Sequence, residues 1–328
     1  MADFKDKKMT VPEAVRELIN DGDMMTFSGF TIWRRPMAMV HEIVRQGKKD
    51  LHLVEVNSGT HGEVLIGAGC VKVWESCFIG HELFGKIGAN LNRKLKNGEI
   101  IVEDYSHVQM VMRLAAGSMG LPFLPTYCAL GTDILNPEYD VLGKKGMRDG
   151  SNHRIPTEKF SYQEDPFYGE RAVLNVPAAR PDVCIAHVQQ VGDEGTVKVM
   201  GQRYSDNEAM KAADKLIVVA EEIVPEEVIR QDPTTNLIPH YLVDAIVEQP
   251  WGAHPTGCFG YYEVDGAFIR DFYSKTKTQE GFDAWAEEWI LGCGDYNEYL
   301  YKLGFNRLDS LRANAAMNYS LRVKRGAR

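Results

Sequence analysis

The sequence lacks the features that mark membrane-spanning, secreted and zinc-binding proteins. No uncharged apolar run approaches the roughly 20 residues that a membrane helix needs. The N-terminal stretch MADFKDKKMT carries charges and no apolar core, so we expect no secretory signal. The six cysteines are scattered and none forms a CxxC pair, which argues against a zinc ribbon and a disulfide scaffold. We therefore expect a cytoplasmic protein with no membrane partner and no metal site.

Net positive charge is absent as well. The 328 residues include 37 Lys and Arg against 46 Asp and Glu, a formal net charge of −9. An acidic chain without a basic block is a poor nucleic-acid ligand, because clustered Lys and Arg are what the phosphate backbone attracts. Hydrophobic residues make up 44% and charged residues 25%, which is typical of soluble globular proteins. We expect one domain over residues 1–328 and no nucleic-acid partner.

Helical and strand patterns alternate along most of the chain. Thr10-Val11-Pro12-Glu13 has the form of a capping box and predicts a helix directly after Thr10. Such alternation is typical of βαβ units, and it predicts an α/β fold with an open, mostly parallel sheet and helices on both faces. Ligands of such sheets bind beyond the carboxyl ends of the strands. We expect strands at 24–27, 51–56, 71–78, 100–105, 121–127, 171–176, 183–189, 196–200, 216–220 and 241–247, and helices at 36–46, 63–66, 91–96, 106–119, 209–213, 279–291 and 296–303.

Two segments depart from this alternation. Residues 136–166 are rich in Gly, Pro and charge and poor in apolar residues, so we expect a long irregular excursion, either a lid or a partner-facing arm. Residues 311–328 form a tail that ends in several basic residues. Asp193-Glu194-Gly195 predicts a hairpin turn.

A segment that resembles a phosphate-binding loop starts at Gly80. The stretch from Gly80 to Ile87, GHELFGKI, follows a predicted strand and fits the spacing GxxxxGK. A P-loop places Ser or Thr after the Lys to bind magnesium, and Ile87 stands there instead. Leu83 and Phe84 are also too bulky for a loop whose backbone N–H groups wrap around phosphate. An ordinary active-site or packing loop is the better interpretation.

A more specific segment begins at Asp21. A predicted strand ends in Ser28-Gly29-Phe30-Thr31, and Arg34 and Arg35 follow before Pro36 opens a helix. Small residues at such a turn allow backbone N–H groups to approach a ligand closely, as in an oxyanion hole or a carboxylate site. The alternative is a tight strand-to-helix turn with a solvated Arg pair.

This segment resembles the A-subunit signature of class I CoA-transferases. That signature contains Asp/Asn-Gly, a short apolar run, Gly-Gly-Phe and a later Gly-x-Pro. Ser28 replaces the first Gly of the Gly-Gly-Phe element, and Arg34 replaces the Gly of Gly-x-Pro. The resemblance is greatest to A subunits of the glutaconate type and spans roughly residues 9–310. Its matching positions are Asp21, Gly22, Gly29, Phe30 and Pro36, followed in the same order by Leu65-Ile66-Gly67, Leu121 to Pro125, Asp165-Pro166-Phe167, Ala186-His187 and Gly252 to Pro255.

The resemblance implies a reaction and a partner. These enzymes move CoA from an acyl-CoA to a free acid through a glutamyl anhydride and a glutamyl–CoA thioester, without a tightly bound cofactor. In the glutaconate type the nucleophilic glutamate lies on the B subunit, and its signature does not stand in this chain. We therefore expect no catalytic residue here, a B-subunit partner in an A₂B₂ assembly, and coenzyme A as a substrate. Glu55, before Val56-Asn57-Ser58-Gly59, is the nearest imitation of the nucleophile.

The residues expected to face substrate lie in two loops. The first contains Ser28, Gly29, Phe30, Thr31, Arg34 and Arg35, and the second contains Gly80, His81 and Glu82. The second loop departs from the glutaconate type, so the acid substrate stays open. His254 is either catalytic or structural, and the structural role is favoured because no nucleophile adjoins it. Two alternative functions also stay open, namely an acyl-CoA hydrolase of the same fold and a non-catalytic binding subunit.

Overall fold

The computed structural model describes residues 7–85, 87–169 and 171–323. Its centre is a 9-stranded sheet. Seven of its strands run parallel to their neighbours, in the order β14 (Ala245–Glu248), β12 (Lys215–Val224), β10 (Val183–Gly192), β1 (Met24–Phe27), β2 (Leu51–Val54), β4 (Val71–Ser76) and β6 (Ile101–Asp104). The hairpin strand β11 (Val197–Lys198) and then β13 (Asn236–Ile238) join antiparallel beside the end of β10. The expected α/β class and mostly parallel sheet are confirmed.

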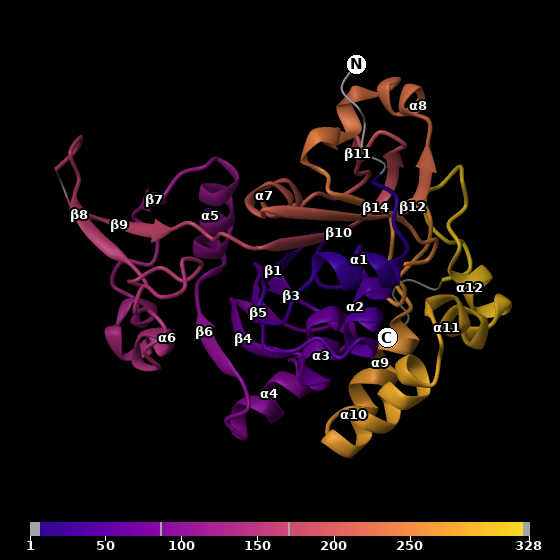
Figure 1. Ribbon diagram of the computed structural model, residues 1–328, viewed down its shortest axis with the longest axis horizontal. Coiled ribbons are helices and arrows are strands. Elements are labelled where there is room, and N and C mark those ends of the chain that lie inside the picture. The colour runs from indigo at the N-terminus through magenta and orange to yellow at the C-terminus, as the bar shows by residue number, and fades with distance from the viewer. Residues whose placement is uncertain (1–6, 86, 170, 324–328) are drawn as a thin grey trace.

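Helices cover both faces of the sheet (Figure 1). On one face the buried core includes side chains of α1 (Val11–Leu18), α2 (Met37–Arg45), α3 (Thr60–Gly67), α4 (Ala89–Lys96), α9 (Gly266–Lys275), α10 (Gln279–Ala286) and α11 (Tyr296–Leu303). On the other face a second core includes side chains of α5 (His107–Ser118) and α7 (Asp206–Ala212). Burial on both sides explains why the central strands read as continuous apolar runs in the sequence.

Local capping signals set the starts of two helices as the sequence predicts. Thr10 and Glu13 form a complete capping box at α1, and Ser106 forms another with Gln109 at α5. Each box satisfies two backbone N–H groups that a helix start otherwise leaves without partners.

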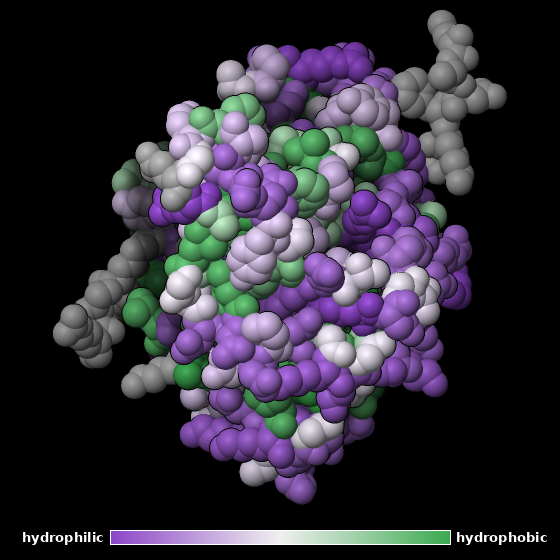
Figure 2. Space-filling model, turned by 90° about the vertical axis from the view of Figure 1, so that its left-hand side faces the viewer, coloured by the Kyte–Doolittle hydropathy of each residue, from purple (hydrophilic) through white to green (hydrophobic). Residues whose placement is uncertain are grey.

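The strands β7 (Phe123–Thr126) and β9 (Ala172–Pro177) correct the expected topology. Both exist, but they form a separate three-stranded antiparallel sheet with β8 (Ser161–Glu164), in the order β7-β9-β8. Pro125 explains why β7 is an edge strand, because proline has no N–H to donate to a neighbour on both sides. This sheet projects from the body next to α6 (Val141–Lys144) in Figure 1. Figure 2 views the molecule from that side and shows apolar side chains gathered among polar ones.

The segment 136–166 is less irregular than expected. It contains α6 and β8, and the buried carboxylate of Glu103 on β6 anchors it. Glu103 accepts a hydrogen bond from the N–H of Leu142 at 2.8 Å and pairs with the ammonium of Lys159.

The C-terminal region contains more helices than the sequence pattern predicts. The expected helix at 279–291 is α10 followed by a π-helical turn over Glu287–Leu291, and α9, α12 (Phe305–Leu311) and the short α8 (Glu226–Arg230) were not predicted. The chain after α12 folds back, since Arg312 forms an isolated antiparallel β-bridge with Tyr262. Residues 324–328 lie outside the described part. Among the described helices, none has the length and apolar character needed to cross a membrane.

A buried charge network joins β4 to α5. The carboxylate of Glu75 accepts hydrogen bonds from Arg113 and His52, each at 2.6 Å, and the Glu75 and Arg113 side chains are fully buried. Burial opposes ionisation of Glu75, but the charges and hydrogen bonds of Arg113 and His52 outweigh it and hold its pKa well below the usual range.

We predict that Arg113→Met lowers the free energy of unfolding by about 3–5 kcal/mol, because it leaves the Glu75 carboxylate buried without its main counter-charge. Urea unfolding of the variant measures this loss. The double variant Glu75→Leu, Arg113→Met is the control and is expected to recover most of the stability. A loss below about 1 kcal/mol in the single variant would contradict a desolvated pair.

Candidate functional site

Three loops meet at the carboxyl edge of the central sheet. Strands β1, β2 and β4 are parallel, so the segments that follow them leave the same edge. Short parallel strands β3 (Asn57–Ser58) and β5 (Phe78–Ile79) hold the second and third segments side by side. The hydroxyl of Thr31 donates to Glu82 Oε1 at 2.8 Å, which joins the first loop to the third. The structure thus brings together the two loops that the sequence singles out.

Asp206, the first residue of α7, binds the turn that follows β1. Asp206 Oδ1 accepts hydrogen bonds from the N–H of Gly29 and from Arg34 Nη1, both at 2.8 Å, and Oδ2 accepts from Arg34 Nη2 at 2.9 Å. Burial opposes ionisation of Asp206, but the charge and hydrogen bonds of Arg34 outweigh it and lower its pKa. A bidentate pair of this kind fixes position as well as charge.

Arg35 ties the first loop to the second. Its guanidinium donates to the carbonyl oxygen of Ser28 at 3.2 Å and to that of Asn57, and it lies 3.6 Å from Glu55 Oε2. Arg34 is 3% exposed and Arg35 1% exposed. Neither is the solvated surface pair of the alternative interpretation, and neither guanidinium is free to meet a substrate carboxylate or a CoA phosphate.

The backbone N–H groups of the turn are already committed within the protein. Those of Ser28 and Phe30 donate to the carbonyl oxygens of Ile185 and Trp33, and that of Gly29 donates to Asp206. The expected oxyanion-binding role therefore does not fall to these three N–H groups. The hydroxyl of Ser28, buried and without a hydrogen-bond partner among the described residues, is the polar group that this turn leaves unused.

Glu55 is sequestered directly after β2. Its side chain is 1% exposed, and Oε2 accepts a hydrogen bond from His61 Nε2 at 2.7 Å. Burial opposes ionisation of Glu55, but His61 and Arg35 outweigh it and lower its pKa. A carboxylate enclosed in this way offers no approach to a thioester carbonyl in this conformation.

The third loop divides into a buried and an exposed half. Gly80 and His81 are buried, and His81 Nδ1 lies 3.1 Å from the Thr60 hydroxyl. Glu82 is exposed and has a φ of 53°, and Leu83 beside it is 91% exposed. A non-glycine residue in the left-handed region is strained, and such strain tends to occur at functional sites.

This loop has none of the geometry of a P-loop. A 3₁₀ turn, η1 (Glu82–Phe84), lies within it where a P-loop wraps around phosphate, and α4 begins only at Ala89. The ring of Tyr273 packs against Gly85, so that an added Cβ there would lie 2.8 Å from it. Lys86 lies outside the described residues.

His254 lies apart in the core. Nδ1 is 2.6 Å from the hydroxyl of Tyr299, Nε2 is 3.1 Å from Asp265 Oδ2, and the ring is fully buried. Trp285, at 2% exposure, also belongs to this core. These contacts support the structural role for His254.

One group of side chains among the described residues has the donor set of a metal site. His187, Glu221 and Cys258 are buried, and their ligand atoms lie within 4.8 Å of one another. Glu221 Oε1 already accepts from His187 Nε2 at 2.7 Å and from the Tyr262 hydroxyl at 2.5 Å, while Oε2 accepts from the N–H of Trp251 at 2.7 Å. Burial raises the pKa of Cys258 well above its ordinary value, which disfavours the thiolate that a metal needs. Glu221 thus holds the group together as a structural hydrogen-bond network, in which His187 Nδ1 has no partner among the described residues.

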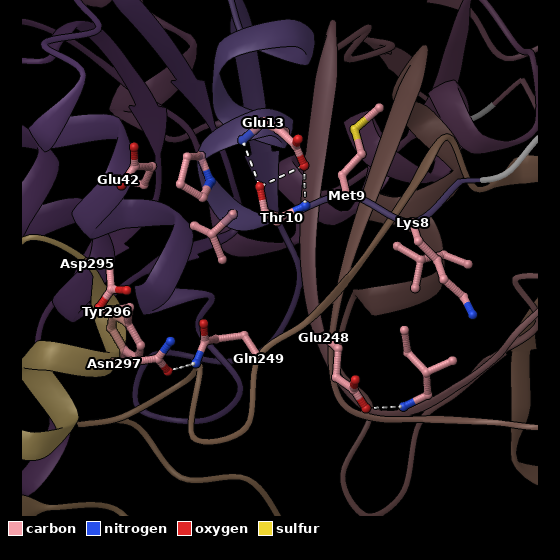
Figure 3. A pocket seen from close by; sticks show the side chains of 14 residues that line it. Lys8, Met9, Thr10, Glu13, Glu42, Glu248, Gln249, Asp295, Tyr296 and Asn297 are labelled. Atoms are coloured by element: carbon pink, nitrogen blue, oxygen red, sulfur yellow. Dashed lines mark hydrogen bonds between the residues drawn. The ribbon is translucent and has the colours of Figure 1, made fainter.

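A cleft of 610 Å³ lies between the N-terminal segment, the end of β14 and α11 (Figure 3). Its carboxylates have protein partners. Glu13 bonds to Thr10, Glu248 accepts from the N–H of Ile223, and Asp295 caps α11. None of the residues of the three loops lines it. The cleft is therefore separate from the candidate site.

We predict that Gly29→Ala destabilises the protein far more than Gly22→Ala. Both glycines have positive φ, 90° and 81°, so each alanine costs about 1–2 kcal/mol in backbone strain. At Gly29 the added Cβ would also lie 2.5 Å from the carbonyl oxygen of Trp33, whereas nothing lies within 4 Å at Gly22. Urea unfolding is expected to show a loss at Gly29 that exceeds the control by at least about 2 kcal/mol. Equal losses of unfolding free energy would mean that the turn shifts to accommodate the added Cβ at no cost.

Comparison with known proteins agrees with this architecture. The chain matches the family model described as Coenzyme A transferase over residues 8–249. It is 37% identical over 315 residues to the A subunit of glutaconate CoA-transferase from Acidaminococcus fermentans, covering 96% of this chain and 97% of that protein. It is 33% identical over 298 residues to the A subunit of 3-oxoadipate CoA-transferase from Pseudomonas knackmussii, covering 90% and 97%.

A solved structure gives the same result. The crystal structure of glutaconate coenzyme A-transferase from Acidaminococcus fermentans superposes with a TM-score of 0.89 at 36% identity, covering 96% of this chain and 98% of that one. The family resemblance, the fold class and the transferase assignment drawn from the sequence are confirmed. The chain belongs to the Coenzyme A transferase family.

Proposed function

We propose that this chain is the A subunit of a heteromeric, cytoplasmic CoA-transferase that acts on an acyl-CoA and a small carboxylic or dicarboxylic acid. The observation that carries the proposal is the burial of Glu55, the nearest imitation of the family nucleophile, in a pair with His61. A covalent mechanism then needs its glutamate from a second chain. The relatives named above are likewise A subunits.

The proposed reaction needs no metal and no tightly bound cofactor. The partner's glutamate carboxylate attacks the thioester carbonyl, forming an acyl-glutamyl anhydride and releasing the CoA thiolate. The thiolate attacks the glutamyl carbonyl, which forms an enzyme–CoA thioester and releases the first acid as its carboxylate. The second acid then attacks this thioester, and the thiolate finally attacks the acyl carbonyl of the new anhydride, so that the glutamate is regenerated and a new acyl-CoA leaves.

This chain would provide one wall of the site. The exposed carboxylate of Glu82 is the polar group that this wall would present, and the buried hydroxyl of Thr31 donates to it. Ser28, Gly29 and Gly80 are buried and Phe30 is half-buried, so these residues would support the wall from within. An A₂B₂ assembly would place this wall opposite the partner's glutamate, where clefts between subunits commonly form.

We predict that co-expression with the partner subunit is required for activity. A CoA-transfer assay with acetate or a dicarboxylic acid as acceptor is expected to give new acyl-CoA only from the pair. Intact-protein mass spectrometry after addition of acyl-CoA alone is expected to show the CoA adduct on the partner chain. An adduct on this chain, or activity of this chain alone, would overturn the proposal and make Glu55 the first residue to replace.

The same assay separates the alternatives. A hydrolase of this fold would release free CoA at one rate with or without an acceptor acid, whereas a transferase would form the new thioester. A non-catalytic binding subunit would leave turnover unchanged when the Glu82 or Thr31 side chain is altered in an intact assembly.

We predict that Glu82→Gln lowers kcat/KM for transfer by about tenfold, because hydrogen bonds to charged groups are worth about 1.5–3 kcal/mol. Glu227→Gln, at an exposed glutamate of α8, is the matched control and is expected to leave kcat/KM unchanged. Steady-state kinetics of the assembled pair measures both. Equal activity of the two variants would remove Glu82 from the substrate wall.

A further inference from the structure

The outer edge of β8 is unpaired. In the small sheet of β7, β9 and β8, strand β8 bonds to β9 on one side and has no neighbouring strand on the other among the described residues. All of its residues, Ser161 to Glu164, are exposed, and Figure 1 shows the strand at the periphery of the molecule. A free edge offers N–H and C=O groups to another strand, and proteins usually protect it with lysine, proline or a bulge. Strand β8 has none of these three.

The turn that follows β8 holds two aromatic side chains in solvent. Phe167 is 86% exposed and Tyr168 is 78% exposed. Their backbone N–H groups donate to Asp165 Oδ1 at 2.8 and 3.1 Å, and the hydroxyl of Tyr127, directly after β7, donates to Asp165 Oδ2. Asp165 therefore fixes the turn before any partner binds. Exposed aromatic side chains on a preorganised turn are typical of the residues that dominate binding at interfaces.

A hollow of 190 Å³ lies at the other end of the small sheet. Its lining includes Asn175, which is 6% exposed. Asn175 Nδ2 donates to the Ser161 hydroxyl at 3.3 Å, and Oδ1 has no partner among the described residues. An aromatic side chain that carries a hydroxyl, as Tyr168 does, suits apolar walls with a buried acceptor. Apolar walls come from Phe123, Phe160 and Pro177, and further polar lining from Thr157 and Glu158.

Symmetry restricts how two copies of β8 can pair. A two-fold axis perpendicular to a sheet keeps each side chain on its own face, and opposed residues of antiparallel strands share a face. Residue i can therefore lie opposite residue j of the second copy only where i + j is even. Two registers are centred within β8, and they place either Tyr162 or Gln163 opposite the same residue of the second copy.

Both registers bring the aromatic turn of one copy to the hollow of the other. With Tyr162 at the centre, Phe167 lies level with Thr157 of the second copy. With Gln163 at the centre, Tyr168 lies level with Glu158 of the second copy. Thr157 and Glu158 both line the hollow. Within β8 neither register sets like charges opposite each other, which would destabilise the pairing. Edge, turn and hollow thus form one self-complementary surface, as a two-fold interface requires.

We propose that β8 pairs with β8 of a second copy of this chain. The pairing forms one continuous sheet with the three strands of each copy, and Phe167 and Tyr168 of each copy pack against the hollow of the other. Two A subunits are then joined directly. The A₂B₂ stoichiometry rests on the proposed function, whereas the pairing of two copies does not.

Disulfide trapping tests the strand pairing independently of activity. Tyr162→Cys and Gln163→Cys are each made in a Cys128→Ser background, because Cys128 is an exposed native thiol. The full chain is purified with its partner subunit and oxidised with diamide. At least one of the two cysteines is expected to join two copies of this chain, since opposed residues of paired strands have close Cβ atoms.

Tyr301→Cys in the same background is the matched control for trapping. Tyr301 is 83% exposed on α11, away from the small sheet, and its cysteine is expected to leave the chains uncoupled. Failure of both β8 cysteines to join two copies would overturn the proposal. A disulfide between β8 and the partner subunit would overturn it as well, because the partner would then cover this edge.

Phe167→Glu tests the contact between turn and hollow, because it brings a charge to an apolar wall. The mass of the complex, measured by light scattering, is expected to fall about twofold while this chain stays bound to its partner subunit. Circular dichroism checks that the variant is folded, as expected at a side chain that is 86% exposed. Phe305→Glu, at a 74% exposed residue of α12, is the matched control and is expected to leave the mass unchanged.

The remaining outcomes separate this proposal from the proposed function. An unchanged mass in Phe167→Glu, or release of the partner subunit from this chain, would overturn the pairing of two copies. A complex that contains the trapped pair but transfers no CoA would support the pairing and refute the proposed function. An active complex with one copy of each subunit would do the reverse.

Discussion

The bidentate pair between Arg34 and Asp206 is the contact on which the candidate site depends. It joins the turn after β1 to the first residue of α7, across the sheet edge where substrate-facing loops leave a parallel sheet. Both side chains are buried, so neither charge can be satisfied by water if the pair is broken. The positive φ values of Gly29 and Arg34 persist because this pair holds the turn in that shape.

The same clamp decides which chemistry the turn can offer. Because Asp206 takes the N–H of Gly29, and two carbonyl oxygens take the N–H groups of its neighbours, these three residues offer no uncommitted amide hydrogen to a ligand. Stabilisation of a tetrahedral oxyanion, which amide donors usually provide, would then fall largely to the partner chain. Such a role for the partner is consistent with the burial of Glu55, the residue of this chain that most resembles the family nucleophile.

Polar groups below the loops are unusually concentrated. Ser28, Glu55, Ser58, His61 and His81 each bury an atom that has no partner among the described residues. Gly62 leaves the space between two of them, since an added Cβ would lie 2.0 Å from Ser58 Oγ and 3.5 Å from Glu55 Oε1. Glu55 and His61 bond to each other, and His81 bonds to Thr60, so these side chains are held through their other polar atoms.

The sequence by itself determined the features that depend on near neighbours: the capping boxes at Thr10 and Ser106, the alternation of strands and helices, and the motifs that mark the family. Tertiary structure alone decided the rest. Asp206 lies 172 residues from Arg34, and β7 left the central sheet to pair with β9. Local periodicity records how a segment folds and which face it buries, but not which distant segment covers that face. Which charged residues pair at the site therefore depends on how distant segments pack together.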